Sequence, residues 1–95
     1  MPQLESPALD QLFDVILGLE TREECYRFFE DLCTVKELQD LSQRMEVALL
    51  LSRGENYIAI GQKAGVSTAT ISRVSRCLNY GTGGYRNAIE KLEDK

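Results

Sequence analysis

The chain has 95 residues, with 15 acidic and 11 basic side chains, no histidine and three cysteines. This length indicates a single domain, residues 1–95, with a modest core. Because there is no histidine, Ser-His and Cys-His catalytic pairs and His-ligated metals are excluded, and we expect neither enzymatic activity nor a cofactor.

The three cysteines, Cys25, Cys33 and Cys77, form no CxxC pair, so they predict neither a disulfide framework nor a zinc site. Cys25 and Cys77 lie on apolar helix faces and are expected to be small buried hydrophobes. No basic segment followed by an apolar run opens the chain, and no apolar stretch has the length of a membrane span. A cytoplasmic location and no membrane partner are therefore expected.

Two amphipathic helices are predicted in the first third of the chain. The first ends near Gly18 and has apolar residues at the helical spacing i, i+3, i+4, i+7: Leu9, Leu12, Phe13 and Ile16. The second begins with a capping box formed by Thr21 and Glu24. Its apolar stripe consists of Cys25, Phe28, Phe29 and Leu32.

A longer helix is predicted from the capping box of Thr34 and Glu37 to about Ser52, with Gly54 as its C-terminal stop. One side is apolar: Leu38, Leu41, Met45, Ala48 and Leu49. Three further residues widen this face toward the whole circumference: Val47, Leu50 and Leu51. A small domain rarely buries a helix on all sides, so a subunit interface is expected here.

Residues 57–78, YIAIGQKAGVSTATISRVSRCL, predict two short helices joined by a tight turn, the helix-turn-helix unit that places its second helix in the DNA major groove. Gly65 relieves the turn and Ser67 caps the second helix. The residues expected to face inward are Ile58, Ile60, Gly61, Val66, Ile71 and Val74, and the missing side chain of Gly61 is expected to permit close helix contact. The alternative is an ordinary helical hairpin with solvated Ser and Thr.

The residues left on the outer faces are candidates for DNA contact. Those on the second helix are expected to reach base edges or phosphates: Thr68, Ala69, Thr70, Ser72, Arg73 and Arg76. A second set is expected to contact the DNA backbone: Arg53, Asn56, Tyr57, Gln62 and Lys63.

The charge distribution separates two parts of the chain. Residues 1–40 carry a net charge of −7, residues 41–86 carry +4 and residues 87–95 carry −1. Because salt screens charge beyond about 8 Å, the positive segment decides the attraction to phosphates. After a glycine-rich break over residues 79–84, a last helix is predicted over residues 84–93, with Tyr85, Ala88, Ile89 and Leu92 apolar. The chain shows no strand pattern and is predicted to be all-α.

From Thr34 to Leu92 the chain resembles the Trp repressor family. The matching stretches are the Thr-led capping box, LSQRMEVALLLSRGE and ATISRVSRCL; the first third matches only in helical pattern. The resemblance implies a six-helix fold and an intertwined homodimer, with dimerisation helices over residues 8–54 and the helix-turn-helix over residues 56–79. It also implies double-stranded DNA as partner and a near-palindromic operator whose half-sites lie about one helical turn apart.

The same resemblance implies a ligand pocket formed by Thr34, Arg44 and Arg73. Two converging arginines fit a carboxylate or another anion. This chain has Val74 where the family has a glycine, and Cys77 where it has a serine, so we expect tryptophan to bind poorly and leave any other effector unidentified. The alternative is that Arg44 contacts a phosphate or carboxylate and Arg73 contacts DNA, without a small ligand.

Together these features predict a sequence-specific DNA-binding transcriptional regulator, with repression as the expected mode. A protein-interaction module is the alternative, since some helix-turn-helix domains bind partners such as RNA polymerase. The acidic residues 1–40 would then contact the transcription machinery without specific DNA reading.

Overall fold

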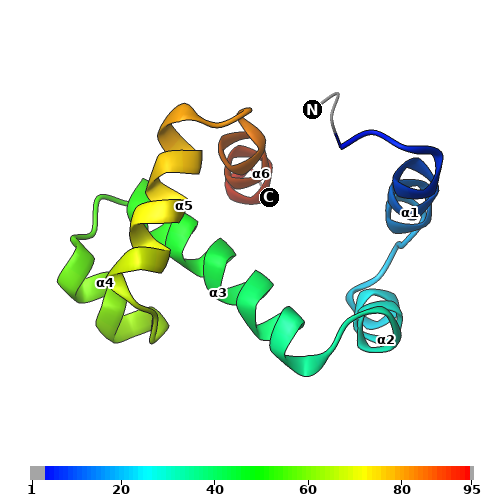
Figure 1. The fold of residues 1–95 in the computed structure, drawn as a ribbon, viewed down its shortest axis with the longest axis horizontal. Coiled ribbons are helices and arrows are strands. Elements are labelled where there is room, and N and C mark those ends of the chain that lie inside the picture. The colour runs from blue at the N-terminus through cyan, green and yellow to red at the C-terminus, as the bar shows by residue number, and fades with distance from the viewer. Residues whose placement is uncertain (1–3, 95) are drawn as a thin grey trace. The chain divides into compact units, whose positions relative to one another are not determined.

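The computed structural model describes residues 4–94, and within that range it contains six α-helices and no β-strand (Figure 1). The helices are α1 (Pro7–Leu17), α2 (Arg22–Leu32), α3 (Val35–Ser52), α4 (Tyr57–Ala64), α5 (Thr68–Tyr80) and α6 (Gly84–Glu93). The predicted all-α class is confirmed. In the described part of the chain, no helix combines the length and apolar character needed to cross a membrane.

The chain divides into two compact units, one ending at Leu38 and the other beginning at Gln39. The first unit contains α1 and α2, whose starts are fixed by local capping. Ser6 Oγ accepts from the backbone N–H of Leu9 at 3.1 Å, and Thr21 Oγ1 accepts from that of Glu24 at 3.1 Å. Each cap satisfies a backbone donor that has no partner within its helix.

The apolar stripes of the first unit are largely uncovered in a single chain. Of the residues described in α1 and α2, none is buried. Phe13 is 51% exposed and Leu17 81% exposed, while Phe28 and Phe29 contact each other edge to face with ring centres 5.4 Å apart. The predicted helices are therefore present, but this unit has no core of its own.

The second unit holds the core, and all four of its helices contribute to it. Val47 and Ala48 of α3 are completely buried, as is Ile60 of α4. The remaining buried apolar residues are Leu50, Ala64, Ile71, Val74, Leu78 and Ile89. In Figure 1, α4, α5 and α6 gather around the C-terminal part of α3, where these residues lie.

Both ends of α3 form as predicted. Glu37 N–H donates to Thr34 Oγ1 at 3.1 Å and Thr34 N–H donates to Glu37 Oε1 at 2.8 Å, so the capping box is complete. At the other end Gly54 has a φ of +83°, and the N–H of Glu55 donates to the Leu50 carbonyl at 3.2 Å. This left-handed C-terminal cap favours glycine because glycine has no Cβ.

Two expectations for α4 are wrong. Ile58 is 76% exposed, because Ile60 and Ala64, one turn apart, take the inward face. A Cβ on Gly61 would lie 3.6 Å from the Val66 carbonyl oxygen, which is an ordinary contact distance. The missing side chain of Gly61 is therefore not what brings the two helices together.

The break after α5 begins later than predicted. Asn79 and Tyr80 continue the helix, which ends at Tyr80 with Gly81 as its C-cap. A Cβ on Gly81 would lie only 2.3 Å from the carbonyl oxygen of Cys77, so the close backbone approach at this corner admits only glycine. Gly83, with a φ of +92°, then leads directly into α6.

These two glycines make a matched pair for a stability test. Gly81→Ala should lower the free energy of unfolding by about 1–3 kcal/mol, because the methyl group meets rigid backbone. Gly61→Ala should raise it by about 0.5–1 kcal/mol, because alanine is the better helix residue and has room there. Urea unfolding followed by circular dichroism measures both changes. Equal effects of the two substitutions would contradict the tight corner at Gly81.

Candidate nucleic-acid interface

Local chemistry fixes the turn between α4 and α5. Asn56 Oδ1 accepts from the N–H of Ala59 at 2.8 Å and so caps α4. Gly65 ends α4 with a φ of +67°, and its N–H donates to the Gly61 carbonyl at 3.0 Å. Ser67 then caps α5 by accepting from the N–H of Thr70 at 3.3 Å. The predicted roles of Gly65 and Ser67 are confirmed.

One face of the helix α5 packs into the core. Ile71, Val74 and Leu78 are buried at the spacing i, i+3, i+7, and α5 packs against both α4 and α6. This burial leaves the opposite face of α5 to solvent. The arrangement is that of a helix-turn-helix unit, in which one face of the second helix packs against the core and the opposite face is exposed to solvent.

The structure brings the predicted residues of α5 together on and beside this outer face. Four of them are exposed: Thr68, Ala69, Arg73 and Arg76. Thr70 and Ser72 are half-buried, and the Thr70 hydroxyl lies 3.2 Å from that of Ser67, so it takes part in the N-terminal cap.

The residues predicted to contact the DNA backbone differ in exposure and in whether their side chains already have a partner within the chain. Arg53 and Gln62 are exposed, and Tyr57 is 40% exposed. The Asn56 side chain is engaged in the α4 cap. Lys63 forms an ion pair with Glu55, although its side chain remains 55% exposed.

The charge of this region has one sign. Between Asn56 and Ile89 the sequence contains four basic residues, Lys63, Arg73, Arg76 and Arg86, and no acidic residue. Glu55 and Glu90 flank this segment, and Glu55 is engaged by Lys63. A surface of this kind attracts phosphates at short range even though the whole chain carries a net charge of −4.

A pocket of about 270 Å³ lies beside α5 in the second unit. It is lined by Leu41, Arg44, Met45, Arg73, Val74, Cys77 and Tyr85. Four of the five predicted pocket residues therefore come together. The fifth, Thr34, is not among the lining residues, and its side chain caps α3 instead.

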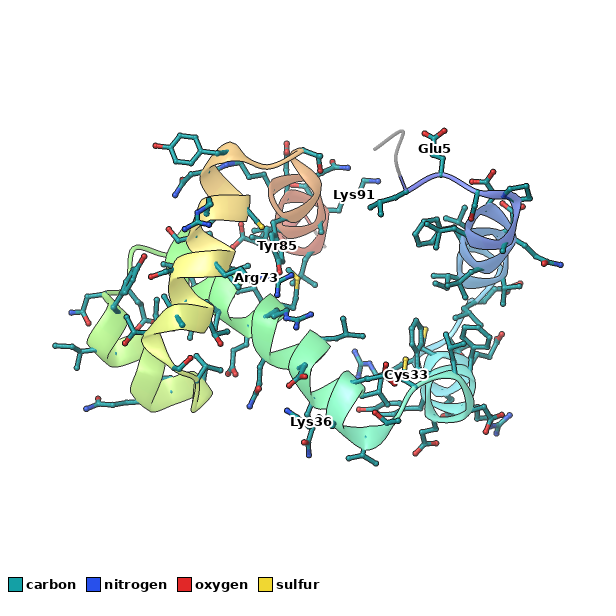
Figure 2. The ribbon with its side chains drawn as sticks, in the orientation of Figure 1. Glu5, Cys33, Lys36, Arg73, Tyr85 and Lys91 are labelled. Carbon is teal, nitrogen blue, oxygen red and sulfur yellow. The ribbon has the colours of Figure 1, made fainter. Side chains whose placement is uncertain are left out.

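The two arginines of the pocket are available to an anion. Among residues 4–94, neither Arg44 nor Arg73 forms an ion pair or a hydrogen bond within the chain. Figure 2 shows Arg73 and Tyr85 between α5 and α6, where both line the pocket. Arg76 is not a lining residue, and the predicted pocket set likewise includes Arg73 and not Arg76.

One expectation about this pocket is wrong. Cys77 is exposed rather than buried, because it lines the open pocket and not the core; Cys25 is half-buried. The lining residues that the sequence analysis missed are Leu41, Met45 and Tyr85. The spacing of Leu41, Arg44 and Met45 on one side of α3 is the signal that could have indicated them.

The sequence model of the family described as Trp repressor protein matches residues 7–93. The chain belongs to the Trp repressor family. Over 92 residues it is 53% identical to YerC, an uncharacterised protein of Bacillus subtilis (strain 168), and the match covers 97% of this chain and 88% of YerC. Membership of this family indicates a DNA-binding regulator.

Two crystal structures are similar to this chain throughout. One is a proposed Trp repressor from Staphylococcus aureus, with a TM-score of 0.94, 51% identity and coverage of 99% of this chain and 94% of that one. The other is a TrpR-like protein from Eubacterium eligens ATCC 27750, with a TM-score of 0.94, 49% identity and coverage of 98% and 96%. The expected Trp repressor fold is confirmed.

Within this Trp repressor fold, Arg86 is a residue whose role the sequence analysis missed. It lies in the first turn of α6, and its Nε donates to the carbonyl of Leu78 near the end of α5 at 2.9 Å. Arginine side chains commonly bond the last carbonyls of a helix. The signal available in the sequence was a single basic residue directly after the glycine-rich break.

The N-cap of α5 can be tested directly. Ser67→Ala should lower the free energy of unfolding by about 1 kcal/mol, because the N–H of Thr70 loses its acceptor. Thr68→Ala, at the adjacent exposed position, is the control and should change stability by less than about 0.5 kcal/mol. Thermal unfolding of the two variants under identical conditions gives the comparison. A larger loss for Thr68→Ala would contradict the capping assignment.

Proposed function

We propose that this protein is a sequence-specific transcriptional regulator that binds a near-palindromic operator as a homodimer and acts as a repressor. Each subunit would insert α5 into the major groove. The observation that carries this proposal is the one-sided packing of α5: Ile71, Val74 and Leu78 are buried on one face, and the opposite face is exposed. The segment around it contains no acidic residue.

The residue types on the outer face of α5 suit groove recognition. The methyl groups of Thr68, Ala69 and Thr70 match thymine methyl groups, and the hydroxyls, including that of Ser72, suit direct or water-mediated contacts to base edges. Arg76 reaches guanine or phosphate. The proposed backbone contacts are made by Arg53, Asn56, Tyr57, Gln62 and Lys63.

Arg73 is a candidate for two roles, binding a ligand in the pocket and contacting DNA. It lines the pocket beside α5, yet it is exposed on the helix that would enter DNA. We propose that it contacts DNA phosphate and that Arg44 contacts a phosphate or carboxylate. Val74 lines the pocket, and its β-branched side chain has few rotamers in a helix with which to move aside for an indole, so tryptophan is not the proposed effector.

The homodimer is proposed from the apolar surface that one chain leaves open. Phe13 and Leu17 of α1 are 51% and 81% exposed, Leu41 of α3 is 47% exposed and Leu92 of α6 is 50% exposed. Each of the two units thus leaves large apolar side chains exposed, and clustered apolar surface is typical of interaction sites. A second copy of the chain would cover it, with residues 8–54 as the dimerisation helices.

Sedimentation at micromolar concentration tests the dimer. The unaltered protein should sediment as a dimer, and Phe13→Glu should shift it toward monomer because a charge replaces apolar contact area. Ile58→Glu makes the same kind of change at a residue that is 76% exposed on α4, outside the proposed interface, and should leave the dimer intact. A monomeric unaltered protein would contradict the intertwined assembly.

Selection of bound sequences from a random duplex library tests DNA reading. Without added ligand, the protein should enrich a palindrome with half-sites one turn apart, and added tryptophan should change neither the sequence nor the yield. Arg76→Gln should then weaken operator binding by about 1–3 kcal/mol if it contacts a base, or reduce the salt slope by about 0.9 if it contacts a phosphate.

The matched control for Arg76→Gln is Arg27→Gln, which removes the same charge from an exposed position on α2. It should leave operator affinity unchanged. Failure to enrich any sequence, with or without tryptophan, would count against DNA reading. It would instead favour a protein-interaction module, for which the net charge of −7 on residues 1–40 is the supporting observation.

A further inference from the structure

The C-terminal end of α5 is held by a side chain from α6. Arg86 Nε donates to the Leu78 carbonyl at 2.9 Å, and Arg86 Nη2 donates to Asn79 Oδ1 at 3.0 Å. Asn79 Nδ2 in turn lies 3.3 Å from Ser75 Oγ, its hydrogen-bond acceptor one turn earlier. A hydrogen-bonded chain therefore runs from the first turn of α6 back along α5.

This contact meets a specific need of α5. The last carbonyls of a helix have no partner within it and carry the negative end of the helix dipole. The last turn of α5 contains no basic residue, so the guanidinium of Arg86 supplies the positive charge from outside. The Cys77 carbonyl is satisfied separately by the N–H of Gly81 at 2.9 Å.

Apolar packing and the Arg86 contact hold α5 in different ways. Ile71, Val74 and Leu78 bury one face of α5, and α6 is anchored by Ile89, which is 5% exposed. Contacts between such side chains are non-directional. The planar guanidinium, by contrast, has fixed donor directions, and here it engages a carbonyl and a side-chain amide of consecutive residues.

We propose that Arg86 is a positioning residue for DNA reading. It fixes the angle of α5 relative to the rest of the second unit, and through that angle it sets the half-site spacing that a dimer accepts. Arg86 itself does not contact DNA. This inference rests on the proposed function, since it assumes that α5 enters the major groove of each half-site.

The test compares Arg86→Gln, Arg86→Lys and Asn79→Ala on the operator that the unaltered protein selects. It also uses operators with one base pair added or removed between half-sites, a displacement of about 3.4 Å. Arg86→Gln should weaken binding about tenfold, equivalent to about 1.4 kcal/mol. The affinity ratio between correct and altered spacing should fall toward one, while the salt slope stays unchanged.

The other two variants separate geometry from charge. Lysine keeps the charge but lacks the planar fork, so Arg86→Lys should restore little of the spacing discrimination. Asn79→Ala removes one acceptor without changing any charge and should reduce discrimination in the same direction. If Arg86→Gln lowers the salt slope by about 0.9 and lysine restores it, Arg86 contacts a phosphate and the proposal is overturned. Unchanged spacing discrimination in all three variants overturns it as well.

Hydrogen exchange in the free protein tests whether Arg86 holds the end of α5, and this measurement does not depend on DNA binding. In Arg86→Gln the amides of residues 77–80 should exchange faster, while those of α4 keep the rate of the unaltered protein. Unchanged exchange at residues 77–80 would overturn the role of Arg86 in holding α5. Faster exchange in a protein that selects no DNA sequence would show that α5 is held by Arg86 while the proposed function, and the DNA part of this inference, fail.

Discussion

The structure depends on one small apolar cluster in the second unit. The helices that meet there are short, with eight residues in α4, 13 in α5 and ten in α6. Isolated helices shorter than about 12–15 residues are marginal in water, so their stability comes from packing against the fully buried Val47 and Ala48 of α3. The helix-turn-helix therefore depends on the long helix, and the same burial decides which side of α5 faces solvent.

That burial divides α5 into faces with different tasks. Ile71, Val74 and Leu78 face the core, with Val74 also reaching the pocket, and Arg73 and Cys77, one turn apart, line the pocket. The remaining face carries the residues proposed to meet DNA. Since the pocket is formed by α3, α5 and α6, a ligand that filled it would contact the elements that position α5. Arg73 lines the pocket and is also exposed on α5, so it is a candidate for both surfaces.

Features set by neighbouring residues could be predicted from the sequence, and features set by distant ones could not. The caps at Thr34 and Ser67 and the left-handed Gly65 follow from chemistry within four residues. The exposure of Ile58 could not be predicted, because α4 is short and rich in apolar residues, and the positions of the other helices decide which of its faces is buried. The exposure of Cys77 depends on an open pocket that is formed by three helices. The sequence predicts a break from residue 79, whereas Asn79 and Tyr80 are helical, and Arg86 from α6 donates to the Leu78 carbonyl and to the Asn79 side chain.

Because the side chains on the outer face of α5 are short, the proposed DNA recognition depends on how accurately this helix is positioned. Thr68, Ala69 and Ser72 have little length with which to compensate for a displaced backbone, whereas lysine and arginine can extend to recover a contact. Recognition by short side chains therefore requires the helix axis itself to be placed accurately. Gly65 and Ser67 fix where α5 begins, and Gly81 and Arg86 fix how it ends. A helix held at both ends can discriminate by shape and methyl contact without relying on a strongly basic surface.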